Sequence, residues 1–158
     1  GKYKRVVVVT DGIFSMLGEA QDLFRLQEVV SEVDKDFEEG IITIVDDSHG
    51  VASFGSSGRG CEEKFNSRCD LLIGTLGKGF GVDGGYVVGD KVFIDYLRES
   101  AATYIYSNPI SPGTAGAALK SVEIMQSDEG AELLDKLKEN LKHFYKKKNN
   151  NKWKIICQ

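Results

Sequence analysis

The sequence lacks any apolar run long enough to cross a lipid bilayer, and no signal-peptide pattern precedes Val6, where the first predicted strand begins. Its three cysteines are an odd number without C-x-x-C spacing, which predicts reduced thiols in a cytoplasmic protein. An excess of positive charge is also missing, since the formal net charge is −4 at pH 7. We therefore expect neither a membrane nor a nucleic acid as a partner.

Histidine is scarce as well, and this scarcity weakens the case for a metal site. Asp46, Asp47 and His49 place three potential ligands within four residues, but the only other histidine, His143, lies on a distant predicted helix. A zinc site needs further ligands that the sequence does not place. We predict no metal, and we expect these residues to cap the following turn, with Asp47 hydrogen-bonded to backbone. His143 is interpreted as a surface residue.

The residues that are present are typical of a globular domain. The chain has 158 residues, of which 41% are hydrophobic and 28% are charged, enough for one domain with an ordinary core. It begins with Gly1 rather than methionine, and residues 146–158 form a Lys/Asn-rich run with a short apolar end. Such a run is typical of a solvated or frayed terminus. We expect the chain to be a segment of something longer.

Hydrophobic periodicity predicts an α/β fold. Residues 6–10 and 41–45 are β-branched runs typical of strands covered on both faces, and about 20–37 carry apolar residues at helical spacing. Together they predict a right-handed βαβ unit with a parallel sheet. A loop is expected over 51–70. Further strands are expected at 71–75, 86–88 and 104–106, and further helices near 92–101, 112–125 and 132–144.

A glycine-flanked lysine follows the strand predicted at 71–75. Gly77 and Gly79 place Lys78 at the end of this strand with almost no side-chain bulk around it. A buried or crowded amine is costly unless it is paired or neutralised, so its position asks for a chemical reason. We interpret Lys78 as the Schiff-base lysine of pyridoxal 5′-phosphate; a surface lysine in a glycine-rich loop is the alternative.

Two phosphate-binding motifs match this region in part and are rejected. Residues 79–84 fit G-x-G-x-x-G, but a dinucleotide fingerprint opens a helix, whereas these glycines lead into the strand predicted at 86–88. A P-loop fails because Leu72 stands where its first glycine belongs, and because Lys78 is followed by glycine rather than by serine or threonine.

Asp46 follows the preceding predicted strand, and together with Lys78 it suits pyridoxal phosphate. The pyridine nitrogen of this cofactor needs a carboxylate, and its aldehyde needs a lysine amine. His49 could face the phenolic oxygen of the ring. Thr75 and the backbone N–H groups around Gly77 could serve the phosphate, which favours hydroxyls and unpaired amides.

Five segments, in order and over about residues 6–125, resemble the α-oxoamine synthases, which are fold-type I pyridoxal-phosphate enzymes. They are Thr10-Asp-Gly-Ile-Phe-Ser-Met16, Val45-Asp-Asp-Ser-His-Gly50, Gly58-Arg-Gly60, Gly74-Thr-Leu-Gly-Lys-Gly79 and Tyr106-Ser-Asn108. The resemblance implies an α/β three-layer sandwich with a mostly parallel sheet, the large domain of an aspartate aminotransferase-like transferase, here incomplete. Residues 1–128 would be its central part, and 129–158 a helix and polar tail that start or replace the missing C-terminal domain.

The resemblance also implies a role for each matching residue. Lys78 would hold the cofactor and move protons at the substrate α-carbon, Asp46 would pair with the pyridine nitrogen, and Thr75 would bind the phosphate. His49, predicted as a catalytic residue together with Lys78, would contact the phenolic oxygen side of the ring, as would Ser15. Ser107 and Asn108 match a loop that reaches the cofactor of a neighbouring subunit, which implies a homodimer with a shared active site.

The reaction implied is the condensation of an amino acid with an acyl-coenzyme A. We favour glycine and a glycine C-acetyltransferase-like enzyme, and the alternative is an 8-amino-7-oxononanoate synthase, which Gly79-Phe-Gly81 resembles. Leu17 and Asp83 depart from the family pattern, and its upstream phosphate loop and downstream carboxylate-binding arginine are absent. A non-catalytic, truncated product is therefore the alternative from another class, and we expect this segment alone to be inactive.

Overall fold

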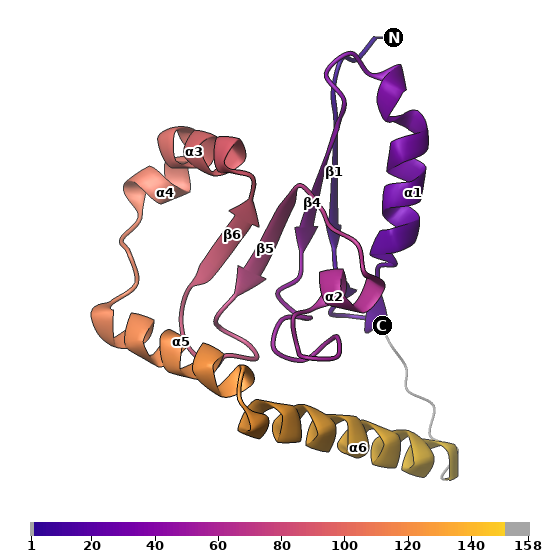
Figure 1. The fold of residues 1–158 in the computed structure, drawn as a ribbon, viewed down its shortest axis with the longest axis vertical. Coiled ribbons are helices and arrows are strands. Elements are labelled where there is room, and N and C mark those ends of the chain that lie inside the picture. The colour runs from indigo at the N-terminus through magenta and orange to yellow at the C-terminus, as the bar shows by residue number, and fades with distance from the viewer. Residues whose placement is uncertain (1, 151–158) are drawn as a thin grey trace.

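A four-stranded sheet forms the centre of the molecule. The structure is a computed structural model and describes residues 2–150. The strands are β1 (Val6–Asp11), β4 (Ile41–Asp46), β5 (Leu71–Thr75) and β6 (Gly85–Gly89), in the spatial order β1-β4-β5-β6 (Figure 1). The first three are parallel, and β6 is antiparallel to β5. Two short strands, β2 (Ile13–Phe14) and β3 (Glu19–Ala20), form a separate pair.

The predicted βαβ unit is confirmed. β1 pairs with β4 in parallel along its whole length, from Val6 opposite Ile41 to Asp11 opposite Asp46. Helix α1 (Leu23–Val33) connects them and continues into a short 3₁₀ helix, η1 (Asp34–Asp36). α1 begins where the Asp22 carboxylate accepts a hydrogen bond from a backbone N–H of the first turn, a common N-cap arrangement.

The remaining helices follow the order of the chain. They are α2 (Cys61–Phe65), α3 (Lys91–Ser100), α4 (Ala102–Tyr106), α5 (Pro112–Met125) and α6 (Asp128–Asn150). α3 and α5 agree with the prediction, and Pro112 opens α5 behind a Ser111 cap. α2 lies in a segment predicted as a loop, and α6 is longer at both ends than the helix predicted over 132–144. His143 is exposed on α6, as predicted. The rest of the predicted polar tail, 151–158, lies outside the described residues.

The core lies between the sheet, α1 and α2. Leu23 of α1, Val45 of β4 and Cys61 of α2 are fully buried and form its centre. Partly buried apolar residues from the same elements and the adjoining loops pack around them: Ile13, Leu26, Phe54, Phe65, Cys69 and Leu72. This small cluster holds the carboxyl ends of β1 and β4 in place, because it packs on the half of the sheet where those strands end.

The strand predicted at 104–106 is wrong. These residues form α4, in which the N–H groups of Tyr104 and Ile105 donate to the carbonyl of Ala101 at 3.0 and 3.1 Å. A three-residue aromatic and β-branched run has strand propensity, but a strand needs a partner edge to satisfy its backbone. Within the described chain this segment pairs with no strand, and local helical hydrogen bonds satisfy its backbone instead.

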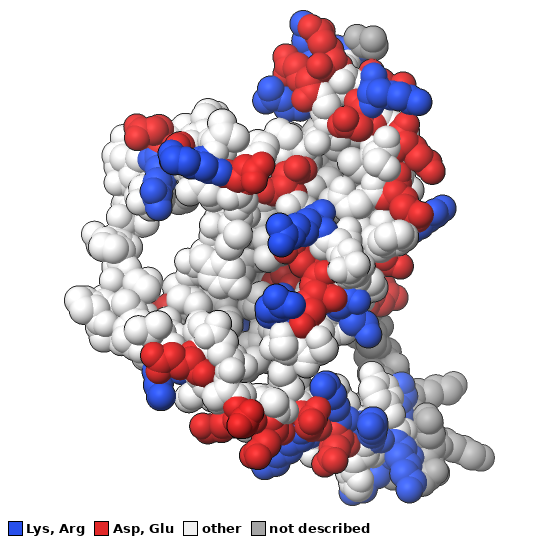
Figure 2. All heavy atoms as spheres, viewed as in Figure 1, with Lys and Arg blue, Asp and Glu red and all other residues white. Residues whose placement is uncertain are grey.

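One face of the sheet is open, which corrects the expectation that β1 is covered on both faces. Val7 and Val9 lie on the same face of β1 and are 50% and 67% exposed. Val87 and Val88, consecutive in the edge strand β6, lie on its two opposite faces and are 42% and 54% exposed. Figure 2 shows that charged residues gather over α1, α2 and α6, whereas the surface over β6, α4 and the segment leading to α5 is largely uncharged. No helix within residues 2–150 has the length and apolar character that crossing a bilayer would require.

A substitution at Leu23 tests whether the core lies between the sheet and α1. Replacing Leu23 by alanine removes a fully buried side chain and should lower the free energy of unfolding by about 2–5 kcal/mol. The matched control is Leu119→Ala on α5, where leucine is 62% exposed and the loss should stay below about 0.5 kcal/mol. Urea unfolding followed by circular dichroism measures both. Equal losses would contradict a core between the sheet and α1.

Candidate active site

The carboxyl end of β4 carries two of the predicted site residues. Asp46 is half-buried, and its carboxylate oxygen Oδ1 accepts the backbone N–H of Ser48 at 2.9 Å. The chain then turns, because the carbonyl of Asp47 accepts the N–H groups of Gly50 and Val51 at 2.9 and 3.0 Å. This turn leaves His49 exposed, close in the chain to the Asp46 carboxylate.

Lys78 lies in the loop between β5 and β6 and is exposed, which corrects the expectation of a crowded amine. The loop is ordered by its own backbone: the N–H of Leu76 donates to Gly84 at 2.9 Å, and that of Val82 donates back to Leu76 at 2.9 Å. Ser121 of α5 also donates its hydroxyl to the carbonyl of Phe80 at 2.9 Å. Within this chain, Lys78 is therefore an exposed side chain on a loop held by its own hydrogen bonds.

The Lys78 loop and the His49 turn touch. A Cβ added to Gly79 would lie 2.6 Å from the Cβ of Ala52 and 2.9 Å from the carbonyl oxygen of Val51, so only glycine permits this approach. One residue before the turn, the N–H of Asp47 donates to the carbonyl of Ile73 in β5 at 2.8 Å. The tertiary structure thus brings together the segments that carry Asp46, His49 and Lys78.

Ser15 lies after β1, on the side of β4 opposite the Lys78 loop. It is exposed, in the turn between β2 and β3, and follows β1, the neighbour of β4 opposite β5. The segment is tied to the site at its start, since the N–H of Gly12 donates to the carbonyl of Asp46 at 2.8 Å. Ser15 and Lys78 therefore follow the two strands that flank Asp46.

Thr75 organises the Lys78 loop. Its hydroxyl donates to the carbonyl of Gly84 at 3.1 Å and accepts the N–H of Gly77 at 3.0 Å. The hydroxyl therefore both donates and accepts a hydrogen bond inside the loop. The N–H of Gly77, one of the amides expected to bind a phosphate, is also used there. A role of Thr75 in binding phosphate stays a prediction.

Ser107 and Asn108 do not join the other site residues in this chain. Both are exposed in the segment after α4, which lies beyond β6 from the end of β4 (Figure 1). Within residues 2–150, no hydrogen bond links either side chain to Asp46, His49, Thr75 or Lys78. Their predicted role toward a neighbouring subunit stays a prediction.

Asp47 bonds to backbone, as predicted. Its side chain is fully buried, and Oδ2 accepts the backbone N–H of Cys61 at 2.6 Å. The second aspartate of the pair is therefore turned into the protein, and only Asp46 lies at the surface of the site. Within the part of the chain that the structure describes, no group of three His, Cys, Asp or Glu side chains could hold a metal ion.

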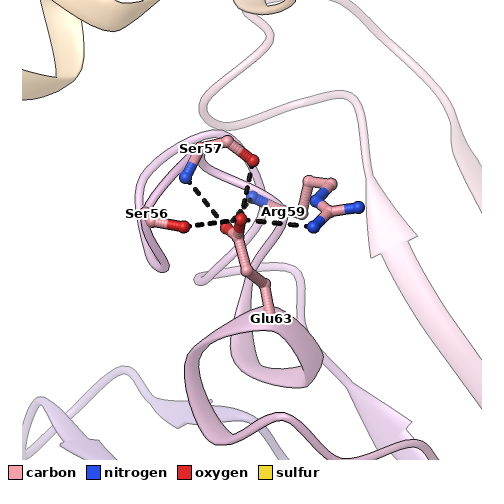
Figure 3. Close-up of polar contacts among 4 residues, drawn as sticks. All are labelled: Ser56, Ser57, Arg59 and Glu63. Atoms are coloured by element: carbon pink, nitrogen blue, oxygen red, sulfur yellow. Dashed lines mark hydrogen bonds and ion pairs between the residues drawn. The ribbon is translucent and has the colours of Figure 1, made fainter.

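A carboxylate that sequence reasoning missed shapes the loop before α2. Figure 3 shows Glu63 of α2 pointing into the loop, where it accepts the hydroxyls of Ser56 and Ser57 at 2.8 and 2.7 Å. It also accepts the backbone N–H groups of Ser57 and Arg59 at 3.0 and 3.2 Å, and the Arg59 guanidinium lies 3.4 Å away. The spacing of serines and a glutamate was the only sequence signal for this cluster.

The electrostatics of Glu63 follow from this geometry. Its side chain is only 10% exposed, and burial by itself would raise the pKa of Glu63. The hydrogen bonds from Ser57 and Ser56 and from the backbone of Ser57 and Arg59 outweigh burial and lower this pKa to about 2. Arg59, in the Gly58-Arg-Gly60 motif, therefore contributes to the shape of the loop.

The family model of the class I and II aminotransferases matches residues 1–158, the whole chain. The chain belongs to this family. Its fold agrees, because a mostly parallel sheet places the candidate residues Asp46 and Lys78 at the carboxyl ends of neighbouring strands.

Curated relatives place the chain in the α-oxoamine synthase branch of the aminotransferase family. An 8-amino-7-oxononanoate synthase of Thermosipho melanesiensis is 42% identical over 143 residues, which cover 89% of this chain and 34% of the relative. The same enzyme of Treponema denticola is 40% identical over 144 residues, covering 90% of this chain and 34% of the relative. The chain thus spans about a third of the length of these relatives.

Solved structures agree with this branch of the family. A serine palmitoyltransferase of Sphingomonas wittichii superposes with a TM-score of 0.76 at 26% identity, over 91% of this chain and 35% of that one. An 8-amino-7-oxononanoate synthase of Francisella tularensis superposes with a TM-score of 0.78 over 97% of this chain and 43% of that one. At 24% identity, the second match supports the fold alone.

Glu63 should make the stability of the domain depend on pH. Its pKa is about 2 when folded, against 4.5 as the ordinary value, so its contribution is complete above pH 4.5 and disappears as the pH falls toward 2. Glu63→Gln should cost about 1–3 kcal/mol at pH 7 and flatten this dependence. Thermal unfolding between pH 7 and pH 3 measures it. A matched control is Glu38→Gln, whose side chain is 69% exposed; an equal loss there would contradict the role of Glu63.

Proposed function

We propose that this chain carries the central part of the cofactor-binding domain of a pyridoxal-phosphate-dependent acyltransferase. The observation that carries the proposal is the placement of Asp46 at the end of β4 and of Lys78 after β5, two adjacent parallel strands whose following loops are in contact through Gly79 and Ala52. A carboxylate and an amine at one sheet edge are the two groups that this cofactor requires of a protein. The class I and II aminotransferase match supports the same cofactor.

The residues present fit pyridoxal phosphate. Oδ1 of Asp46 accepts the Ser48 N–H, whereas Oδ2 has no hydrogen-bond partner within residues 2–150 and can accept one from the protonated pyridine nitrogen. When bound, the cofactor supplies an electron sink for charge that develops at the substrate α-carbon. The exposed Lys78 amine can reach a ligand above the sheet edge, bind its carbonyl group and move a proton at that carbon.

His49 and Ser15 complete the described half of this site. His49 is exposed three residues after Asp46, and Ser15 follows β1 on the other flank of β4. Both carry hydrogen-bonding groups suited to a phenolic oxygen. We retain Thr75, Ser107 and Asn108 as phosphate-binding residues, the latter two acting on a neighbouring subunit of a homodimer.

We infer that the substrates are alanine and a seven-carbon acyl thioester, in place of glycine and an acetyl group. The relatives are named for a nine-carbon product with an amino group on carbon 8 and an oxo group on carbon 7. A seven-carbon acyl group and alanine give this skeleton when the amino acid loses its carboxyl group as carbon dioxide and the thiol leaves. The curated relatives support this alternative rather than glycine C-acetyltransferase.

Residues 1–128 form the proposed central part of the large domain, and 129–158 the helix and tail that start or replace a C-terminal domain. A non-catalytic product is the second candidate, because the chain spans about a third of its curated relatives and one sheet face is open. Cytoplasmic location stays a prediction.

Lys78 gives the direct test of cofactor binding. After incubation with pyridoxal phosphate and reduction with borohydride, peptide mapping by mass spectrometry should find the pyridoxyl group on Lys78 in preference to other lysines. Asp46→Asn should lower labelling at Lys78 by about tenfold, because a neutral amide holds the ring nitrogen less well than a carboxylate. The control is Lys91→Ala on α3, which should leave labelling at Lys78 unchanged. Labelling spread evenly over the lysines would contradict the proposal.

Substrate choice needs a full-length enzyme that carries this segment. Release of the thiol should be faster with alanine and pimeloyl-coenzyme A than with glycine and acetyl-coenzyme A, by about 10-fold or more if one pocket must hold the extra methylenes. Lys78→Ala should abolish both rates. A preference for glycine and the acetyl donor would instead restore the glycine C-acetyltransferase interpretation.

A further inference from the structure

Asp47 is a buried carboxyl group that the proposed chemistry does not use. Its side chain is 0% exposed, although it adjoins Asp46 in the sequence. Oδ2 accepts the Cys61 N–H at 2.6 Å, and Oδ1 has no hydrogen-bond partner within the described residues. A buried polar atom without a partner is costly, so this position asks for a reason beyond packing.

The space around Asp47 is made by glycines from three separate segments. A Cβ on Gly12, after β1, would lie 2.5 Å from Oδ1, and one on Gly50, in the His49 turn, would lie 2.1 Å from it. A Cβ on Gly60, before α2, would lie 1.8 Å from Oδ2. These distances are far below any real contact, so each of the three glycines lies against this carboxyl group where a larger residue would clash with it.

The backbone of the same region links the strands that carry the site. The N–H of Asp47 donates to Ile73 of β5 at 2.8 Å, and the N–H of Gly12 donates to Asp46 at 2.8 Å. The carbonyl of Asp47 accepts the two N–H groups that close the His49 turn. Residue 47 is therefore in contact with the segments that lead to Ser15, to His49 and to Lys78.

We propose that Asp47 is a positioning residue, whose buried carboxyl fixes the turn after β4 so that Asp46 and His49 face the cofactor side of the sheet. This inference rests on the proposed function. It assigns different roles to two adjacent aspartates: Asp46 meets the ligand, and Asp47 holds the peptide that presents Asp46.

The charges around Asp47 suit this division of roles. Burial raises the pKa of Asp47, and the nearby carboxylates of Glu62 on α2 and Asp46 on β4 raise it further, while hydrogen bonds from Cys61 lower it. Burial, with the Asp47 carboxyl beside it, also raises the pKa of the Cys61 thiol, and burial and Asp47 likewise raise that of Tyr86 on β6. Asp47 therefore differs from Asp46 in burial and in its surroundings, which agrees with different roles for the two carboxyl groups.

The histidines allow a test with an internal control. In carbon-13 NMR spectra of the chain, His49 reports on the turn, and His143, on α6, reports on a remote surface. Asp47→Ala should shift the His49 resonance, leave that of His143 in place, and slow pyridoxyl labelling of Lys78 about 10- to 100-fold. Asp47→Asn keeps an acceptor for the Cys61 N–H and should restore both readouts.

Two further variants separate positioning from general stability. Glu63→Gln destabilises the same region without touching Asp47, and should leave the His49 resonance of the folded protein unchanged. Gly12→Ala places a methyl group against Oδ1 and should shift His49 as Asp47→Ala does, so it carries the test if Asp47→Ala fails to fold. A His49 resonance unmoved in Gly12→Ala, or moved equally in Glu63→Gln, would overturn the positioning role. Absence of labelling in the unsubstituted chain would overturn only the proposed function, because the His49 readout needs no cofactor.

Discussion

Parallel pairing of β4 with β1 on one side and with β5 on the other decides where the candidate functional residues lie. In parallel strands the carboxyl ends meet at one edge, so loops far apart in sequence become neighbours there. The register sets Asp11 opposite Asp46 and Asp46 opposite Ile73. Ser15, His49 and Lys78 therefore lie after three adjacent strands, although the first and the last are 63 positions apart in the sequence.

Glycine and buried carboxylates hold these loops together where apolar packing does not reach. The fully buried apolar centre consists of Leu23, Val45 and Cys61. Beyond it, Asp47 fills the space between three backbone segments, and Glu63 gathers the loop of Ser56, Ser57 and Arg59. Each carboxylate satisfies backbone N–H groups that a loop has no ladder or helix to satisfy, which is why polar groups stabilise this edge.

The open sheet face agrees with the short length over which the chain matches its relatives. Valines of β1 and β6 are about half exposed, and the segment covers roughly a third of its curated relatives. A parallel sheet is ordinarily covered on both faces. Exposed valines are therefore typical of a sheet face that another layer covers, and the described residues do not supply such a layer. The candidate residues lie in segments that are ordered by their own contacts, the Lys78 loop and the His49 turn.

The sequence by itself predicted the strands of the main sheet, the βαβ unit and the candidate residues Asp46, His49 and Lys78, because periodicity and short-range motifs are local properties. It failed at Tyr104–Tyr106, where strand propensity gave way to local helical hydrogen bonds, and at α2, too short for a periodic signal. Only the tertiary structure decided that Asp47 is buried while Asp46 is half-exposed, that Lys78 is exposed, and that Ser107 and Asn108 stand apart. These outcomes depend on which segments meet across the sheet, and no local pattern contains that information.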